Sequence, residues 1–235
     1  MRGKSEELMQ FTAFNDGKEL ARWLAKDVAG ELSSAVSERG AALLAVSGGN
    51  TPVQFFRELS AIDIDWSKVC VTLADERFVP PDSGRSNQRL VTLELLQHKA
   101  ARAHFLPLYA DAEIGTSVAE AEKALAEHLP VDVIVLGMGT DGHTASLFPG
   151  SEGLREAADP KGERLLMAVD APGAAEPRIT VTLPVIAGAR TQYLHIEGAE
   201  KREVFETAQE AGDPGQAPIG FVLEHCPDLK VVWAR

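Results

Sequence analysis

The segment VDVIVLGMGTDGHTASLFPG, from Val131 to Gly150, decides the fold class of this chain. Its apolar first part is typical of a strand that is buried on both faces of a sheet. A glycine-rich turn with Asp141 and His143 follows at once. Because open α/β sheets bind ligands beyond the carboxyl ends of such strands, we expect chemistry at this turn. His143 is the candidate catalytic imidazole, and a tight turn with a solvated histidine is the alternative.

The same turn contains the G-x-G-x-x-G pattern of dinucleotide-binding proteins, formed by Gly137, Gly139 and Gly142. That pattern should open a long helix whose N-terminus binds a pyrophosphate. Here Pro149 and Gly150 stop any helix within about two turns. Asp141 would also repel the pyrophosphate. We therefore reject a nicotinamide cofactor.

Predicted strands and helices alternate along the rest of the chain. Helical spacing of apolar residues predicts a long helix from Asp16 to Arg39, ended by Gly40. The other predicted helices span 52–59, 87–97, 116–127 and 199–208, and the predicted strands span 41–46, 69–73, 131–136, 165–169, 179–183, 192–196 and 230–233. This alternation predicts an α/β fold with a mainly parallel sheet.

The composition limits the possible ligands. The 235 residues, of which 45% are hydrophobic, fit one large domain, so a single α/β domain over residues 1–235 is expected. A net charge of -12 argues against binding of nucleic acid or acidic membranes, which needs clustered Lys and Arg. An anionic ligand must therefore meet a local basic pocket.

The cysteines and the hydropathy pattern indicate the cellular compartment in which we expect the protein. Cys70 and Cys226 lie far apart and match no metal-ligand spacing, so we expect free thiols in a reducing compartment and no metal. Neither a signal-peptide pattern nor about 18 consecutive apolar residues occur. These observations predict a soluble cytoplasmic protein, and we favour a monomer.

The loop SGGNTP, which follows the predicted strand 41–46, is a candidate anion site. Glycines let the backbone approach a ligand, and exposed amides at the start of a helix favour negative charge. The candidate binding residues are Ser47, Gly48, Gly49, Asn50 and Thr51. A plain turn in which Thr51 caps the next helix is the alternative.

Ser47 also suggests a second mechanism. Its surroundings, AVSGG, resemble the nucleophile elbow of serine hydrolases, but Ala45 stands where the elbow needs a glycine. A triad of Ser47, an aspartate, and His195 or His225 remains the alternative.

Charged residues also gather after the predicted strand 69–73 and near two later segments. An arginine fork suits a phosphate or carboxylate, and a nearby carboxylate can orient an imidazole. A lysine in the first turn of a helix opposes the helix dipole, which hints at a ligand. The candidates are Asp75, Arg77, Ser86, Asn87, Arg178 and Lys201. Solvated or salt-bridged surface groups are the alternative.

Together, the segments SGGNTP (47–52), ADERFVPPDSGRSN (74–87), LGMGTDGHTASLFPG (136–150) and PRITVTLP (177–184) resemble the motifs of the 6-phosphogluconolactonases. The resemblance implies a modified Rossmann-like fold, with helices on both faces of a mainly parallel sheet. It also implies hydrolysis of 6-phospho-D-glucono-1,5-lactone in the oxidative pentose phosphate pathway, without a metal or organic cofactor.

The resemblance further implies roles for the candidate residues. His143 would activate water and then protonate the leaving ring oxygen, while Asp141 or Asp75 orients its ring. The carbonyl oxygen would be bound by the amides of Gly48 and Gly49 or by the 137–142 turn. Phosphate binding is assigned to Arg77, Arg178 and Lys201, with help from the SGGNTP loop.

Two relatives of this family offer alternatives. Glucosamine-6-phosphate isomerase-deaminases are similar around DGH, but they carry a glutamate for ring opening where Phe148 stands here. Phe148 cannot transfer protons, so the isomerase hypothesis loses a catalytic group. A non-catalytic sugar-phosphate sensor would need only the anion pocket and would not need His143.

Overall fold

The computed structural model describes residues 10–170, 175–210 and 213–235. The N-terminal residues 1–9, where we expect no signal peptide, lie outside the described residues, as do parts of the loops 171–177 and 211–218.

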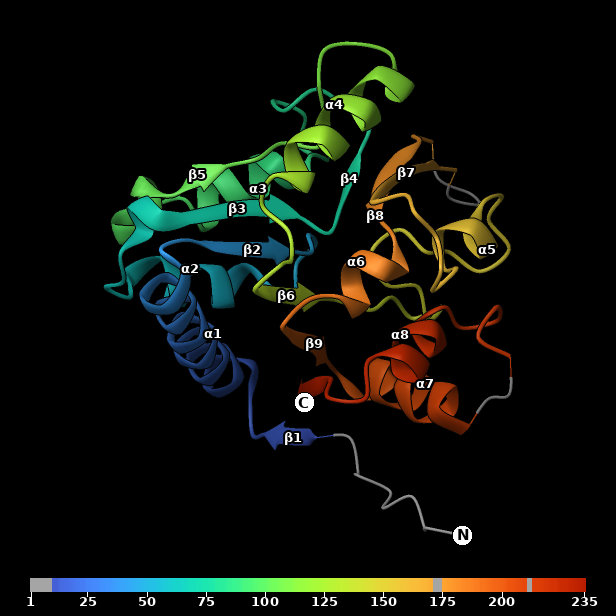
Figure 1. Ribbon diagram of the computed structural model, residues 1–235. Coiled ribbons are helices and arrows are strands. Elements are labelled where there is room, and N and C mark those ends of the chain that lie inside the picture. The colour runs from blue at the N-terminus through green and yellow to red at the C-terminus, as the bar shows by residue number, and fades with distance from the viewer. Residues whose placement is uncertain (1–9, 171–174, 211–212) are drawn as a thin grey trace, which may run out of the picture.

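The central sheet has seven parallel strands within the described part of the chain (Figure 1). Their order is β1-β10-β9-β6-β2-β3-β5. Strands β2, β3 and β6 are buried along their whole length, as strands covered on both faces must be. The predicted mainly parallel sheet is confirmed. The bounds are β1 (Phe11–Phe14), β2 (Ala42–Val46), β3 (Val69–Leu73), β5 (His104–Phe105), β6 (Val133–Leu136), β9 (Thr191–Glu197) and β10 (Lys230–Ala234).

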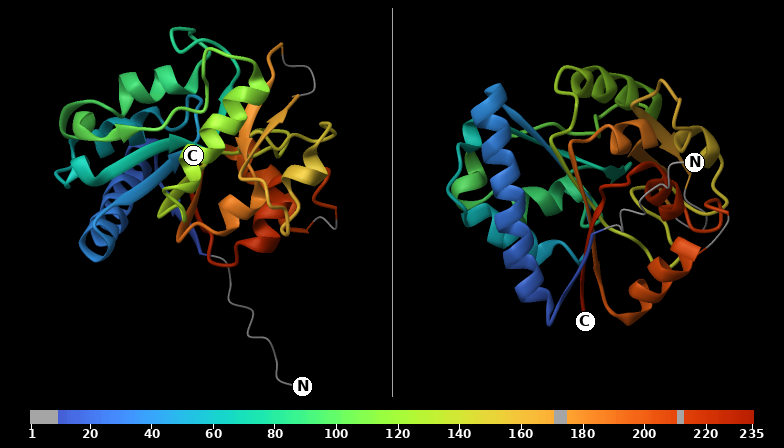
Figure 2. Two further views of the ribbon diagram at one scale, coloured as in Figure 1. Left: turned by 45° about the horizontal axis from the view of Figure 1, so that its top comes forward. Right: turned by 60° about the horizontal axis from the view of Figure 1, so that its bottom comes forward.

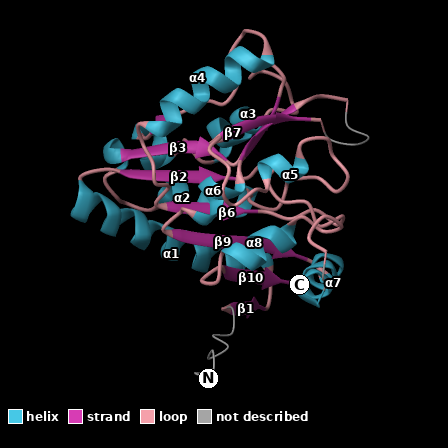
Figure 3. Cartoon of the chain, turned by 45° about the vertical axis from the view of Figure 1, so that its right-hand side comes forward, coloured by secondary structure: helices cyan, strands magenta, loops and turns pink. Residues whose placement is uncertain are grey.

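Helices lie on both faces of this sheet (Figures 2 and 3). Successive side chains of a strand point to opposite faces. In β9, the Tyr193 hydroxyl donates to Asp27 of α1 (2.6 Å), whereas the Gln192 side chain donates to the Ile186 carbonyl of α6 (3.3 Å). Helices α1 and α6 therefore cover opposite faces. The bounds are α1 (Gly17–Arg39), α2 (Val53–Ala61), α3 (Asn87–Glu94), α4 (Ile114–Ala126), α5 (Leu154–Ala157), α6 (Leu183–Ala187), α7 (Ala199–Glu210) and α8 (Ile219–His225).

Helix α1 follows the sequence prediction closely. The Asp16 side chain caps its start by accepting a hydrogen bond from the Glu19 amide (2.8 Å). At its end, Gly40 adopts φ 81°, and its amide donates to the Val36 carbonyl. A glycine reaches this left-handed conformation without steric cost, which explains why the helix ends there.

A second, antiparallel sheet corrects part of the prediction. It consists of β4 (Asp75–Arg77), β8 (Arg178–Val181) and β7 (Leu166–Val169), in the order β4-β8-β7. The segment 75–77, expected as a loop, forms a short strand. The predicted strands 165–169 and 179–183 exist in part, but they pair here instead of joining the parallel sheet. An alternating pattern indicates a strand and does not identify its partner.

A buried carboxylate ties β4 to the start of α3. Glu76, which is 1% exposed, accepts hydrogen bonds from the amides of Arg77, Asn87 and Gln88 and from the Ser86 hydroxyl, at 2.7 to 3.0 Å. Burial raises the pKa of Glu76, while its four donors act in the opposite direction. The position of β4 relative to α3 therefore depends on one side chain.

We expect Glu76→Gln to lower the free energy of unfolding by about 2 to 4 kcal/mol, because the amide nitrogen would face backbone donors and leave them unpaired. Urea denaturation measures the change. Glu120→Gln, an exposed position on α4, is the matched control and should unfold like the original protein. Equal unfolding midpoints for the two variants would contradict the structural role of Glu76.

Candidate active site

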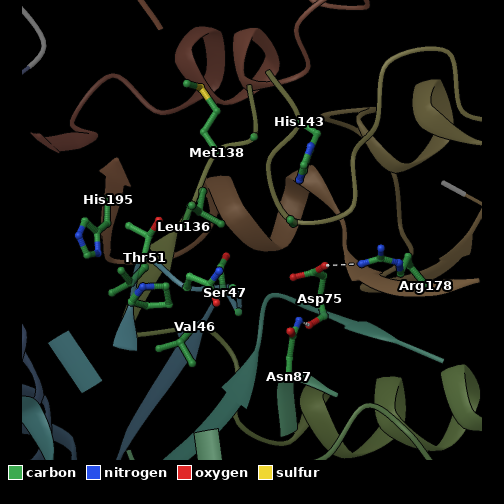
Figure 4. A pocket seen from close by; sticks show the side chains of 18 of the residues that line it. Val46, Ser47, Thr51, Asp75, Asn87, Leu136, Met138, His143, Arg178 and His195 are labelled. Atoms are coloured by element: carbon green, nitrogen blue, oxygen red, sulfur yellow. Dashed lines mark hydrogen bonds and ion pairs between the residues drawn. The ribbon is translucent and has the colours of Figure 1, made fainter. Parts of the chain in front are cut away.

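A cavity of about 270 Å³ opens at the carboxyl ends of β2, β6 and β9 (Figure 4). Strands β2 and β6 are neighbours, and the chain continues from β2 to β3 on one side and from β6 toward β9 on the other. Such a switch point is where open α/β sheets bind ligands. The predicted site residues that line the cavity are Ser47, Gly48, Gly49, Asn50, Thr51, Asp75, Arg77, Asn87, His143, Arg178 and Lys201.

His143 and Asp141 form a hydrogen-bonded pair at this cavity. The imidazole points into the cavity (Figure 4), and its Nδ1 lies 2.5 Å from Asp141 Oδ1. The hydrogen bond from His143 lowers the pKa of Asp141, so this carboxylate is ionised at neutral pH. Because a carboxylate only accepts, Nδ1 carries the proton and Nε2 is the basic nitrogen. The structure thus places Asp141, and not Asp75, against the ring.

The glycines around His143 shape the turn that carries the Asp141–His143 pair. The Gly139 amide donates to the His143 carbonyl (2.9 Å), and a Cβ at position 139 would overlap the imidazole. The Gly142 amide donates to the Gly139 carbonyl. No helix occurs over residues 137–150, all of which are described, in agreement with our rejection of a dinucleotide site.

The two glycines of the SGGNTP loop have free backbone amides, whereas the Ser47 amide donates to the Val135 carbonyl (3.0 Å). Helix α2 begins at Val53, and no side chain caps it, so the expectation of Thr51 as a plain N-cap is wrong. Among the described residues, no acceptor binds the amides of Gly48 or Gly49. A Cβ at position 48 would overlap the side-chain amide of Asn87, so the close approach requires glycine. Free amides at a helix start favour an anion.

Ser47 is not part of a triad. Its hydroxyl is buried, and no described group bonds it. His195 Nε2 lies 3.1 Å from Glu197 Oε1, and His225 Nδ1 lies 2.9 Å from the Phe221 carbonyl. His195 Nδ1 also lines the cavity side of the molecule without a partner among the described residues, so no hydrogen bond joins Ser47 to either histidine. The serine-hydrolase alternative therefore has no base in contact with its nucleophile in this structure.

Two arginines face each other across the small sheet. Arg77 of β4 and Arg178 of β8 are directly paired in register, and like charges in that position repel. Both Nε atoms are buried without a partner among the described residues. Arg77 donates to Asn87 Oδ1 (2.7 Å), and burial lowers the pKa of Arg178 while Asp75 raises it. This pair offers unused donors and positive charge to an anion.

Asp75 and Ser86 have other partners than expected. Asp75 accepts a hydrogen bond from the Ser146 hydroxyl (2.6 Å) and lies 3.9 Å from Arg178 Nη1. Ser86 lies outside the cavity, where its hydroxyl donates to Glu76 and accepts from the Arg89 amide. Ser86 caps α3, and the structure therefore gives no support to its expected role in binding.

Lys201 reaches the cavity from the first turn of α7. Burial lowers its pKa, and the nearby carboxylates of Glu197 and Glu200 raise it. The Lys201 ammonium group forms no hydrogen bond or ion pair with another described residue. A half-buried ammonium group with free donors fits an anionic ligand.

Sequence reasoning missed several apolar residues of the cavity wall. Phe148 was considered only as a side chain that cannot transfer protons, yet its ring centre lies 4.5 Å from that of His143. Its position five residues after His143, in the same turn segment, is the signal that could have pointed to it. The other lining residues without a prior prediction are Val46, Pro52, Phe56, Val135, Leu136, Met138 and Ala145.

The described residues also bear on the predictions made for the two cysteines and for membrane-spanning helices. Cys70 and Cys226 are buried and free, and burial raises the pKa of Cys226 to about 12. None of the described helices is both long and apolar enough to cross a membrane.

Comparison with known proteins agrees with this geometry. The family described as glucosamine-6-phosphate isomerases/6-phosphogluconolactonase matches residues 15–233. A 6-phosphogluconolactonase of Rhizobium meliloti (strain 1021) is 49% identical, with 94% of this chain and 97% of the relative covered. A 6-phosphogluconolactonase of Pseudomonas aeruginosa is 46% identical, with 87% of each covered.

Solved structures give the same result. The crystal structure of a 6-phosphogluconolactonase from Shewanella baltica OS155 superposes with a TM-score of 0.93 at 39% identity, covering 97% of this chain and 99% of that chain. A second, from Neisseria gonorrhoeae FA 1090 and described as a putative 6-phosphogluconolactonase, gives a TM-score of 0.89 at 38% identity, covering 97% of this chain and 100% of that chain. The chain therefore belongs to the glucosamine-6-phosphate isomerase/6-phosphogluconolactonase family.

Proposed function

We propose that this protein hydrolyses 6-phospho-D-glucono-1,5-lactone to 6-phospho-D-gluconate, the second step of the oxidative pentose phosphate pathway. The observation that carries this proposal is the Asp141–His143 pair in a cavity whose cationic side chains retain free donors. The names of the most similar relatives support the same substrate. An isomerase is less well supported, because Phe148 cannot exchange a substrate proton.

The proposed reaction uses His143 as base and then as acid. Its Nε2 removes a proton from water as the water oxygen bonds to C1 of the lactone. The bond from C1 to the ring oxygen then breaks, and the imidazolium returns the proton to that oxygen. Asp141 holds the ring through Nδ1 and stabilises the transient positive charge. The step needs no metal or organic cofactor.

We assign the two anionic parts of the reacting substrate to different ends of the cavity. Arg178 and His143 both contact Phe148, so the arginine pair lies at the reaction end, where it would stabilise the developing oxyanion. Lys201 comes from the start of α7, which follows β9, whereas both arginines come from the small sheet. We assign the phosphate to Lys201 and the free amides of the SGGNTP loop.

This assignment revises the expectation that all three cations bind phosphate. The hydrolysis forms a carboxylate at C1, so a second basic end is useful for both the transition state and the product.

We expect His143→Ala to lower kcat by about 10²-fold or more, since the reaction loses its base and acid. Glucose-6-phosphate dehydrogenase generates the lactone in place, and its disappearance is followed at a pH where spontaneous hydrolysis is slow. His128→Ala, an exposed histidine outside the cavity, is the control.

The outcomes of this assay separate the alternatives. Near-normal turnover by folded His143→Ala would exclude the proposed mechanism. If the original protein does not exceed buffer, a non-catalytic sugar-phosphate-binding protein becomes the better hypothesis.

Asp141→Asn should reduce kcat by about 10- to 100-fold with little change in KM, because a neutral amide cannot stabilise the imidazolium. Steady-state kinetics with the same coupled assay measures both constants. Asp228→Asn, at an exposed turn, should behave like the original protein. An unchanged kcat in Asp141→Asn would show that the carboxylate has no part in the proton transfer.

The two basic ends should respond differently to substitution. We expect Lys201→Met to raise KM by about 10-fold or more with a smaller effect on kcat. The substitution removes a cation that binds the phosphate group, and this group does not change during the reaction. Arg178→Lys should mainly lower kcat, since a lysine cannot reproduce the guanidinium donors. Lys123→Met on the exposed surface of α4 is the control. A kcat effect confined to Lys201→Met would reverse the assignment of the two ends.

A further inference from the structure

Phe148 contacts two groups of the proposed reaction at once. Its ring centre lies 4.5 Å from that of His143, with 38° between the planes, and 5.6 Å from the guanidinium carbon of Arg178. His143 comes from the glycine turn and Arg178 from β8, so they lie on separate elements. The phenyl ring is therefore a physical connection between them.

The backbone around Phe148 is fixed to the strands that carry the arginines. The Ser146 hydroxyl donates to Asp75 of β4 (2.6 Å), and the Ser146 amide donates to the Thr180 hydroxyl of β8 (3.1 Å). Ala145 adopts φ 48°, an uncommon left-handed conformation that turns the chain between His143 and Ser146. These contacts hold the ring at a set position relative to both strands.

An aromatic ring suits this position for an electrostatic reason. Its face attracts a cation without using any of the cation's hydrogen-bond donors. The Arg178 guanidinium is buried and its Nε has no partner among the described residues, so it keeps donors for a ligand. His143 becomes cationic during the proposed proton transfer, and the same ring then lies beside that charge.

We propose that Phe148 is a positioning residue. It holds the His143 imidazole and the Arg178 guanidinium at fixed positions relative to each other, so that the lactone carbon fits between them. This inference rests on the lactonase function proposed above. Phe148 itself exchanges no proton and forms no hydrogen bond with substrate. It acts by fixing where the base and the oxyanion donor lie, and misplacement of such groups by about 1 Å can cost about 10²-fold in rate.

Phe148→Leu should lower kcat by about 10-fold or more and change KM by less than about 3-fold, because the Lys201 end remains intact. Phe148→Tyr keeps the ring face and should restore kcat to within about 3-fold of the original value. Phe14→Leu is the matched control, because it removes a half-buried ring that contacts Trp23 at 5.5 Å and does not line the cavity. Thermal unfolding of all three variants reports their stability separately.

A spectroscopic measurement tests the contact without using activity. The Phe148 ring should shift the His143 ring-proton resonances in NMR spectra, and this shift should disappear in Phe148→Leu and persist in Phe148→Tyr. A normal kcat in Phe148→Leu beside an active original protein would overturn this role and leave the lactonase function intact. Equal loss of kcat in the Leu and Tyr variants would also overturn it. Inactivity of the original protein would overturn the proposed function, and this role with it.

Discussion

The buried carboxylate of Glu76 is the constraint on which the site depends. Side chains of a strand alternate between its two faces, so fixing Glu76 against the start of α3 turns Asp75 and Arg77 toward the cavity. Four donors compensate for the burial of this carboxylate, and a partly satisfied arrangement would be costly. A structural residue thus sets the direction of its two neighbours.

The cavity combines two kinds of sheet. Parallel strands end together at one edge and present the SGGNTP loop and the turn with His143. The antiparallel pairing of β4 with β8 adds Arg77 and Arg178 in direct opposition, which is unfavourable by itself. Nearby Asp75 offsets part of this repulsion. A bound anion would offset the rest of the repulsion between the two arginines, and this repulsion therefore favours binding of an anionic ligand.

Close backbone approach explains two glycines of the site, of which Gly139 belongs to the pattern that first suggested a dinucleotide site. Gly139 leaves room for the imidazole, and Gly48 leaves room for the Asn87 amide. In both places the glycine positions a polar side chain of the site, and no long helix follows the turn. A short glycine pattern therefore has different consequences when the segment after it differs.

Local patterns in the sequence determined the α/β class, the alternation of strands and helices, the long helix α1, and most polar residues of the cavity, because periodicity and turn chemistry act over a few residues. Only the tertiary structure decided that Asp141 and not Asp75 contacts His143, that Ser86 caps a helix, and that Arg77 opposes Arg178. The opposition of Arg77 and Arg178 depends on pairing between segments about 100 residues apart, and strand pairing over such distances leaves no periodic signal in either segment. The contacts of Asp141 and Ser86 are local, but a sequence pattern does not fix the side-chain conformation that selects each partner. The contact of Phe148 with Arg178 was also decided by the tertiary structure, since it joins the 137–150 turn segment to β8.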